Sequence, residues 1–251
     1  MNALVSIICA AYNSSLYIED TIRSILSQTY LNWELIIIDD CSTDNTVEIA
    51  TKYVNSCFRV NLIRNIVNSG PGVTRNNGIA VAKGQYIAIC DSDDIWFPEK
   101  LEHQISFMQK KQIAISYTSY ELINLCGSRL NKTVRVANSP IGYTDYLKNT
   151  IIGFSTSVID RNICKCIIFE DMRSREDTFL WCTLLQQGYM AYGIDEVLVQ
   201  YRIRDSSVSA NKMKAATQVW NLYNKKLQIP LGKCLFYFSC YVFHAFKKRF
   251  L

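Results

Sequence analysis

Apolar and polar positions alternate between two periods along the first 110 residues. Short continuous apolar runs are followed by segments in which apolar residues recur every three or four positions. The first pattern is typical of strands buried on both faces, and the second of amphipathic helices. Together they predict strands at 5–11, 33–39, 60–63 and 85–90. They also predict helices at 16–28 and 46–54, a third helix that follows a Gly-Pro-Gly turn and ends at Ala82, and a fourth that begins at Pro98. We therefore expect an α/β fold in which helices flank a mostly parallel sheet.

The pattern becomes less regular after about residue 112. It predicts strands at 113–120, 133–137 and 151–159, a helix from Glu176 to a stop at Gly188, a strand that ends near Tyr201, and tail helices on either side of Pro230. We expect three parts: a first half at 1–110, a smaller mixed half at 111–210, and a basic helical tail at 211–251. We expect the first two parts to form one continuous domain.

Composition narrows the class of protein. With 251 residues, of which 49% are hydrophobic, the chain is long enough to bury a full core. The ten cysteines form no Cys-x-x-Cys pair and the only histidines are His103 and His244, so we expect reduced thiols and no zinc site. The amino terminus lacks the features of a signal peptide, which favours a cytoplasmic location.

Basic residues are concentrated at the end of the chain. Eight of the 27 Lys and Arg residues, but none of the 22 acidic residues, follow Asp205. The aromatic segment Leu235–Phe246 lies among them, and its twelve residues are fewer than the about 20 that span a bilayer. We expect this tail to lie on the inner face of a membrane rather than to bind nucleic acid. The alternative is a helix packed on the protein core.

Acidic residues stand where two of the predicted strands end. Asp39 and Asp40 follow one apolar strand, and Asp91 and Asp93 follow another. Ligands of parallel sheets bind beyond the carboxyl ends of the strands, and carboxylates suit Mg²⁺ or Mn²⁺ that also contacts phosphate. These strand ends predict a metal–nucleotide site, whereas a single Asp at such a place more often caps a helix.

Four stretches of the first half also resemble the family 2 glycosyltransferases, which are inverting enzymes of the GT-A fold. The stretches are VSIICAAYN (5–13) with SILSQTY (24–30), WELIIIDDCSTD (33–44), RNNGIAVAKG (75–84) and YIAICDSDD (86–94). Arg-Glu-Asp at 175–177 is a further match in the second half, and Tyr201-Arg202 a fainter one. Together these motifs are far more specific than a lone Asp-x-Asp.

The resemblance implies roles for individual residues. The nucleotide-sugar would contact Ala11, Tyr12, Asn13, Asp40, Arg75, Asp91 and Ser92. Asp93 would hold Mn²⁺ or Mg²⁺, and Asp177 would be the catalytic base. Glu176 and Asp94 would lie next to these two carboxylates and hold them in position. A solvated helix charge is an equal alternative for Arg75, and stabilisation of the helix dipole is the alternative for Asp177.

The sequence departs from the family pattern at three positions. Cys41 and Ala11 replace the usual Gly and Pro, which affects loop shape only. Arg204 stands where a His is common, so a metal or phosphate contact from this loop is in doubt, and we expect Arg202 and Arg204 to be solvated.

The resemblance implies transfer of a hexose from a UDP-sugar to a lipid-linked oligosaccharide on a polyprenyl diphosphate. Glucose or galactose is the preferred sugar, with N-acetylhexosamine possible. The setting would be synthesis of bacterial O-antigen, capsule or exopolysaccharide. One alternative is a nucleotidyltransferase, although the segment 10–16 lacks a glycine-rich basic phosphate loop. The other is a non-catalytic, membrane-associated module that binds nucleotide-sugars.

Overall fold

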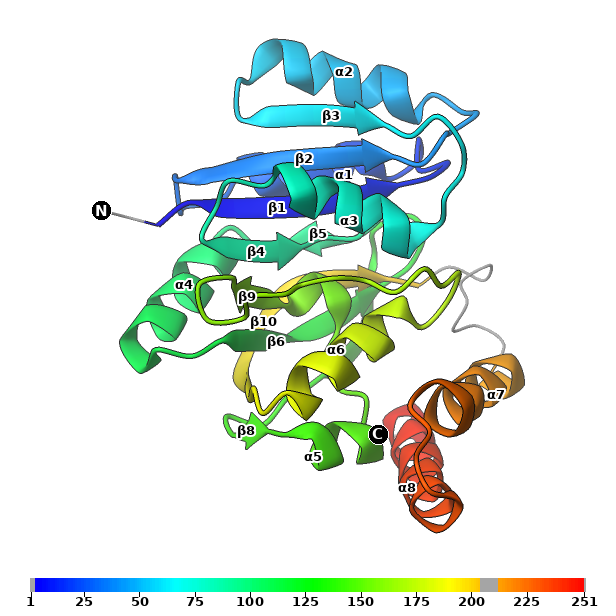
Figure 1. The fold of residues 1–251 in the computed structure, drawn as a ribbon. Helices are drawn as coiled ribbons and strands as arrows, with labels where there is room; N and C mark the ends of the chain where they lie inside the picture. Colours follow the sequence, from blue (N-terminus) through cyan, green and yellow to red (C-terminus); the bar gives the residue numbers. More distant parts are fainter. Residues whose placement is uncertain (1–2, 204–211, 251) are drawn as a thin grey trace.

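The computed structural model describes residues 3–203 and 212–250, and side chains at 212 and 247–250 lie outside the description. One mixed sheet runs through the molecule in the order β3-β2-β1-β4-β9-β6-β10-β5, with β7 and β8 added at its sides (Figure 1). The α/β fold expected from the sequence is therefore confirmed.

The parallel part of the sheet lies in the first half of the chain. Strand β1 (Val5–Ala11) pairs with β2 (Trp33–Asp39) and with β4 (Tyr86–Ile89), and β3 (Val60–Arg64) extends the sheet beyond β2. The bounds of β1 and β2 are those predicted. Because all four strands run in the same direction, their carboxyl ends meet at one edge.

Helices cover both faces of this sheet. Helices α1 (Ile18–Leu26), α2 (Thr46–Ser56) and α4 (Lys100–Lys111) belong to one face, and α3 (Pro71–Val81) and α6 (Glu176–Gln186) lie in front of the other in Figure 1. Neighbouring strand residues enter opposite apolar clusters, Ile7 with the first face and Ile8 with the second, because successive strand side chains alternate. This double burial explains the continuous apolar runs in the sequence.

The second half continues the sheet with mixed pairing. Strands β6 (Ile115–Ile123) and β10 (Ala191–Arg202) are parallel, and β9 (Val158–Asp160) runs antiparallel between β4 and β6. The short β5 (Ile95–Trp96) and β8 (Pro140–Ile141) pair with β10, and β7 (Arg129–Val134) pairs with β6. Because β9 pairs with strands of both halves of the chain, the two halves share one sheet.

Two predictions for this half were wrong in detail. The segment 151–159 is a 3-10 turn, η1 (Phe154–Thr156), followed by β9, and not one long strand. Within it Thr156 Oγ1 donates to the Gly153 carbonyl at 2.6 Å and Ser157 Oγ to the Phe154 carbonyl at 2.7 Å. Such local bonds compete with the strand ladder. The strand predicted at 133–137 lies earlier, as β7.

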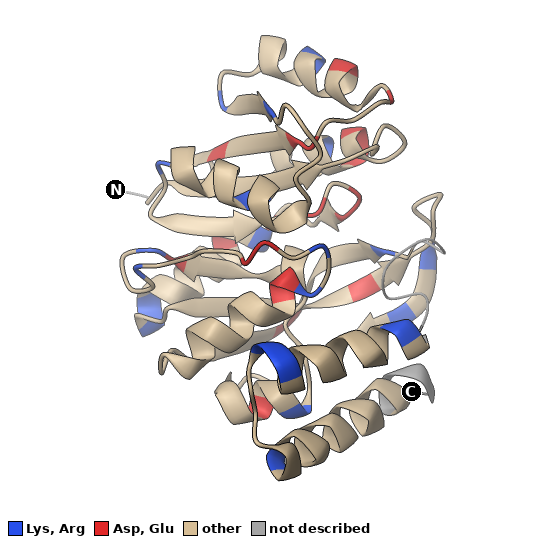
Figure 2. Ribbon diagram, turned by 45° about the vertical axis from the view of Figure 1, so that its right-hand side comes forward, with Lys and Arg blue, Asp and Glu red and all other residues tan. Residues whose placement is uncertain are grey.

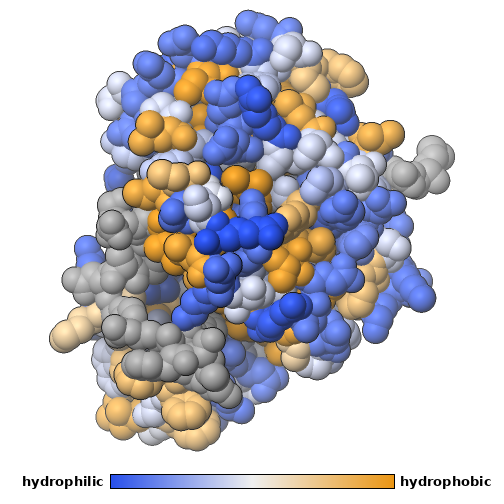
Figure 3. Space-filling view, turned by 180° about the vertical axis from the view of Figure 1, so that it is seen from behind, coloured by the Kyte–Doolittle hydropathy of each residue, from blue (hydrophilic) through white to orange (hydrophobic). Residues whose placement is uncertain are grey.

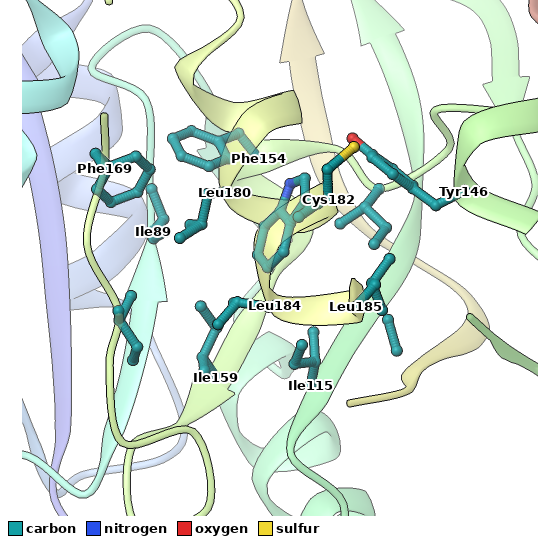
Figure 4. Packing of buried hydrophobic residues seen from close by; sticks show 14 of the residues in the cluster. Ile89, Ile115, Tyr146, Phe154, Ile159, Phe169, Leu180, Cys182, Leu184 and Leu185 are labelled. Carbon is teal, nitrogen blue, oxygen red and sulfur yellow. The ribbon is translucent and has the colours of Figure 1, made fainter. Parts of the chain in front are cut away.

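Helix α6 is anchored by a large apolar core. Leu184 and Leu185 point from the helix toward Ile159 and Ile115 of the sheet, and Leu180 lies beside Ile89 (Figure 4). All of these side chains are buried. The helix begins at Glu176, as predicted. Its first turn is thereby held rigidly against the carboxyl edge of the sheet.

The tail forms a helical layer at the lower edge of the molecule. Helix α7 (Lys212–Asn221) passes through a π-turn, η2 (Leu222–Lys226), to α8 (Leu231–Phe250), which contacts α5 (Tyr143–Lys148) and α7. The predicted first residue of the tail helix, Asn211, lies outside the described residues. In the described part of the chain, no helix is long and apolar enough to cross a bilayer.

Candidate active site

A cleft of 720 Å³ opens at the carboxyl ends of β1 and β4, between them and the start of α6. Asp91, Ser92 and Asp93 line one side, and Glu176 and Asp177 line another. Alternation along the parallel strands predicted the first group, and the Arg-Glu-Asp motif predicted the second. Residues that are more than 80 positions apart in the sequence thus face one space.

The loop after β4 is fixed by hydrogen bonds from the second half. The Asp91 amide donates to Ser155 Oγ at 2.9 Å, and Ser155 Oγ donates to Asp94 Oδ2 at 2.5 Å. The Arg202 amide donates to Asp94 Oδ1 at 2.9 Å, and Arg202 Nε donates to the Asp93 carbonyl at 2.8 Å. Asp94 therefore caps no helix and instead holds the shape of the loop.

The expectation that Arg202 is solvated was wrong. Its side chain is 1% exposed, and besides the loop it bonds Asp20 Oδ2 at 3.1 Å and the Leu125 carbonyl at 2.7 Å. The guanidinium also stacks over the ring of Tyr17 at 4.9 Å. An arginine whose donors are nearly all satisfied can be buried. Arg204 lies outside the described residues.

Arg75 is also buried, so its alternative as a solvated helix charge was wrong. Its Nη2 donates to Asp91 Oδ1 at 2.8 Å and its Nη1 donates to Glu176 Oε1 at 2.7 Å. The guanidinium lies 4.4 Å from the ring centroid of Phe154. Burial alone would lower the pKa of Arg75, but the charges of Asp91 and Glu176 raise it above its ordinary value. A permanent positive charge thus joins the two acidic sides of the cleft.

Asp177 is half-buried in the first turn of α6 and accepts a hydrogen bond from Thr178 Oγ1 at 3.2 Å. Its neighbour Glu176 is more deeply buried, and burial raises the pKa of Glu176 against the lowering effect of Arg75. The two acidic residues of the motif therefore differ: Glu176 is an ion-pair partner, whereas Asp177 is open to the cleft. Only a carboxylate within reach of a ligand can act as a base.

A smaller hollow of 250 Å³ adjoins the cleft at the end of β1. Among the predicted residues, Ala11, Tyr12, Asp40 and Arg75 line it. Asn13 does not: its backbone is left-handed with φ 48°, and its Oδ1 accepts from the Thr43 amide at 2.9 Å. Asn13 therefore shapes the loop beside the hollow.

Asp40 is already heavily hydrogen-bonded. Its Oδ1 accepts from Asn65 Nδ2 and from the Ser69 amide, each at 2.8 Å, and its Oδ2 accepts from the Gly70 amide at 2.9 Å. Burial opposes ionisation, but the bonds from Asn65, Ser69 and Gly70 hold the pKa of Asp40 below its usual value. A carboxylate has about four acceptor positions, so about one remains for a ligand.

Ser92 is buried, and its Oγ is 2.7 Å from Ser14 Oγ. This bond ties the loop after β4 to the loop after β1. Sequence reasoning did not find Ser14 or Ser155 because isolated serines carry no motif. Arg175 was noted only as part of the Arg-Glu-Asp match, although Arg173 and Arg175 both line the cleft.

The residues at the loop after β4 fit a divalent cation. Burial, and then the negative charges of Asp93 and Asp91, raise the pKa of Asp94 well above its ordinary range. Within the described ranges no three His, Cys, Asp or Glu side chains gather into a metal site. Mg²⁺ or Mn²⁺ needs only one or two carboxylates when phosphate and water complete its shell. Asp93 beside an open cleft meets that requirement.

The sheet and the cleft define an enzyme of the GT-A fold. The chain belongs to glycosyl transferase family 2, whose sequence pattern matches residues 6–168. It is a glycosyltransferase.

Relatives align along nearly the whole chain. TuaG of Bacillus subtilis, assigned to teichuronic acid biosynthesis, is 42% identical over 246 residues, which cover 98% of this chain and 97% of TuaG. WfgD of Escherichia coli, named a UDP-Glc:alpha-D-GlcNAc-diphosphoundecaprenol beta-1,3-glucosyltransferase, is 37% identical over 247 residues, which cover 98% of this chain and 95% of WfgD.

Solved structures show the same fold at low sequence identity. TarS of S. aureus in complex with UDP-GlcNAc superposes with a TM-score of 0.68 at 18% identity, covering 88% of this chain and 66% of that one. The mannosyltransferase PcManGT from Pyrobaculum calidifontis, in complex with GDP-Man and Mn²⁺, superposes with a TM-score of 0.70 at 16% identity, covering 92% and 66%. The chain spans 40% of a longer TarS chain.

Proposed function

We propose that this enzyme transfers a hexose, with inversion, from a UDP-sugar to a saccharide carried on a polyprenyl diphosphate. The observation that carries the proposal is the position of Asp177, an accessible carboxylate that shares the cleft with the loop Asp91–Asp93. An acceptor hydroxyl placed between them has a base on one side and the leaving diphosphate on the other.

The residues divide the chemistry between them. Asp177 accepts the proton of the attacking hydroxyl. Asp93 would hold Mg²⁺ or Mn²⁺, and such a cation would neutralise the charge that develops on the departing diphosphate. Arg75 holds Asp91 in place beside it. One base opposite one leaving group implies a single displacement, and therefore inversion at the anomeric carbon.

The two ends of the cleft are proposed to bind different substrates. Residues 1–110, together with Arg173, form the hollow for the nucleotide, with Tyr12 at its rim, and residues 111–210 contribute the acceptor side and Asp177. Glucose is the preferred sugar because the similar WfgD and WfaP proteins are named for UDP-Glc. Their names also specify a diphosphoundecaprenol acceptor, which supports the lipid-linked substrate.

The tail is proposed to hold the enzyme on the inner face of the membrane, where such an acceptor is found. One side of α8 packs on the protein: Cys234 is fully buried, and Phe238 contacts Trp220 at 5.2 Å between ring centroids. The other side exposes apolar side chains. They are Leu231, Leu235, Phe236, Val242, Phe243 and Phe246. The face that this list defines, called the α8 face below, is apolar and exposed to solvent.

Basic residues flank the α8 face. Lys233 lies near its start, and Lys247, Lys248 and Arg249 fall in its last turns. In Figure 3, which shows the molecule from behind, apolar side chains gather at the lower edge, where α8 lies in Figure 1. Aromatic side chains flanked by cations are typical of a helix that lies in the interface of an anionic bilayer. The core-packed interpretation of the tail therefore applies to one side of α8, and the interfacial interpretation is our proposal for the other.

Donor binding and transfer test the proposed function. Purified enzyme with Mg²⁺ or Mn²⁺ is incubated with UDP-, GDP-, CMP- and dTDP-sugars and a polyprenyl-diphosphate saccharide. We expect metal-dependent binding of one UDP-sugar, lost in Asp93→Ala, and a product of inverted anomeric configuration by NMR. Asp177→Asn should keep the affinity for UDP and lose turnover by roughly a hundredfold to ten-thousandfold.

Each alternative gives a different result. A binding module shows no turnover that Asp177→Asn could remove. A nucleotidyltransferase forms a nucleotide-sugar and releases pyrophosphate instead of UDP. A product of retained configuration overturns the single displacement while leaving the glycosyltransferase in place.

A further inference from the structure

Four arginines line the cleft, and they differ in their partners. Arg75 and Arg202 are paired with carboxylates. Among the described residues, Arg173 and Arg175 form no such ion pair: Arg173 Nη1 donates to Asn68 Oδ1 at 2.5 Å, and Arg175 Nη2 reaches only the Ala215 carbonyl at 3.4 Å. Two cations therefore remain available to an anionic ligand of the cleft.

The two available arginines lie at different ends. Arg173 lines both the cleft and the nucleotide hollow, and it bonds the loop that carries Asn68. Arg175 lines the cleft but not the hollow, and it contacts α7 through Ala215. Figure 2 shows basic and acidic positions side by side at the start of α6. Arg175 is therefore the cation on the side of Asp177 and of the tail.

The backbone of Arg175 is held in an unfavourable conformation. Its φ of 64° is left-handed, and it immediately precedes α6, whose early turn is closed by a bond from the Phe179 amide to the Arg175 carbonyl at 2.9 Å. Glycine adopts this conformation without strain, whereas a side chain costs about 1 kcal/mol or more. Strain of this kind is typical of positions where the side chain has a function.

The hydrogen-bond donors of the Arg175 side chain are only partly satisfied by the protein. Its Nε is buried without a hydrogen-bond partner in the described structure. A buried donor without an acceptor costs free energy, so the protein holds the guanidinium at the cleft at a cost that its own contacts do not offset. Diphosphate oxygens suit a guanidinium, which presents paired donors in a fixed plane.

We propose that Arg175 binds the diphosphate that links the acceptor saccharide to its lipid. This inference rests on the proposed function. In an acceptor whose reacting sugar is attached directly to the diphosphate, one pyranose ring separates the attacking hydroxyl from the phosphate. Arg175 and Asp177 are two residues apart at one helix start, which matches that short spacing. The lipid can then leave along α7 toward the α8 face.

The test compares two acceptors with and without the diphosphate. One is the saccharide on a short-chain prenyl diphosphate, and the other is the same saccharide on a neutral alkyl chain. Both are assayed with wild type, Arg175→Gln and Arg175→Lys. Arg135→Gln is the matched control, because Arg135 is exposed, pairs with Asp195 at 3.2 Å and lies outside the cleft.

We expect Arg175→Gln to raise KM for the diphosphate acceptor by roughly tenfold to a hundredfold. KM for the alkyl acceptor and the affinity for UDP should stay within about twofold of wild type, and Arg175→Lys should recover part of the loss. An equal loss on both acceptors overturns the proposal. A loss of UDP affinity also overturns it, because it assigns Arg175 to the donor diphosphate.

Binding decides the proposal even if no transfer is observed. Wild type that transfers to neither acceptor refutes the proposed function, and titration of the short-chain prenyl diphosphate then tests Arg175 alone. The titration is done with UDP and Mg²⁺ saturating the donor end. Weaker binding by Arg175→Gln than by Arg135→Gln supports the subsite, and equal binding overturns it.

Discussion

Arg75 and Glu176, which are 101 positions apart in the sequence, form a buried ion pair of 2.7 Å across the cleft. The other side of the same guanidinium holds Asp91 at 2.8 Å. One residue of α3 therefore sets the separation between the loop after β4 and the helix that carries Asp177. The alignment of donor and base depends on this single cation.

Replacing Arg75 with lysine should impair catalysis more than folding. Lysine keeps the charge but cannot bridge two carboxylates with the geometry of a guanidinium. We expect kcat/KM to fall by roughly a hundredfold, because small misplacements of reacting groups are costly. Arg75→Ala, by contrast, leaves the buried carboxylate of Glu176 without its partner and should reduce the free energy of unfolding by about 3–5 kcal/mol.

Steady-state kinetics and urea unfolding measure the two effects separately. A double-mutant cycle with Glu176→Gln reports the coupling of the pair. If Arg75→Lys retained full activity, the bridge would have no positioning role.

Ser155 should control metal affinity without contacting the metal. Its hydroxyl fixes the Asp91 amide and Asp94, so Ser155→Ala frees the loop that carries Asp93. We expect weaker Mn²⁺ binding in the presence of UDP, by about tenfold, and a stability loss of about 1–3 kcal/mol. Mn²⁺ titration followed by EPR measures the affinity.

Ser157, two residues further along the chain, provides the control. It is equally buried, and its hydroxyl bonds only the Phe154 carbonyl, at 2.7 Å, among the described contacts. Ser157→Ala should lose similar stability and keep its Mn²⁺ affinity. Equal Mn²⁺ affinities in the two variants would contradict the assigned role of Ser155.

The sequence predicted the parallel half well and the contacts of the site only in part. The bounds of β1 and β2 could be read directly because strands buried on both faces leave continuous apolar runs. Asp91, Asp93 and Asp177 were found because strand ends and a motif marked them. The burial of Arg202 could not be predicted, since its partners Asp20 and Leu125 are brought to it only by the fold.

Substitutions on the α8 face should weaken membrane binding and leave the fold intact. Phe236 and Phe243 are 56% and 66% exposed, so a glutamate at either place meets solvent in the free protein. In the bound state it meets lipid and anionic headgroups instead. We expect Phe236→Glu with Phe243→Glu to reduce co-sedimentation with anionic vesicles by at least about tenfold.

Phe58→Glu is the matched control, because Phe58 is 93% exposed but follows α2, away from the tail. It should sediment with vesicles as wild type does. Unchanged sedimentation of the double variant would remove the membrane from the proposal. Removal of residues 231–251 is a less decisive test, because it would also expose Trp220 and the side of α5 that α8 contacts.

Lys100 should make stability depend on pH. It is fully buried under Trp96, bonds Gln104 Oε1 at 2.7 Å, and burial lowers the pKa of Lys100 to about 7. The unfolded chain keeps this lysine charged up to its ordinary pKa, so between pH 7 and 9 the unfolded state binds more protons than the folded state. Stability from this group therefore rises with pH in that interval, by about 2 kcal/mol.

Lys100→Met removes the titrating group and nearly preserves the volume. Urea unfolding at pH 7 and pH 9 should show a smaller rise in the free energy of unfolding for the variant than for wild type. If the free energy of unfolding rose equally with pH in the variant and in wild type, Lys100 would stay charged in its site, held by Trp96 and Gln104.

Strand β9 has a consequence for the exchange of parts between related enzymes. It pairs Ala88 with Val158 on one side and Ser116 with Val158 on the other, so its three residues join the donor and acceptor regions in one sheet, as the pairing of β5 with β10 also does. A chimera joined near residue 110 would place the β9 of one parent against the β4 of the other. Acceptor specificity is therefore best transplanted through the loops and the start of α6, with β4, β9 and β6 kept from a single parent.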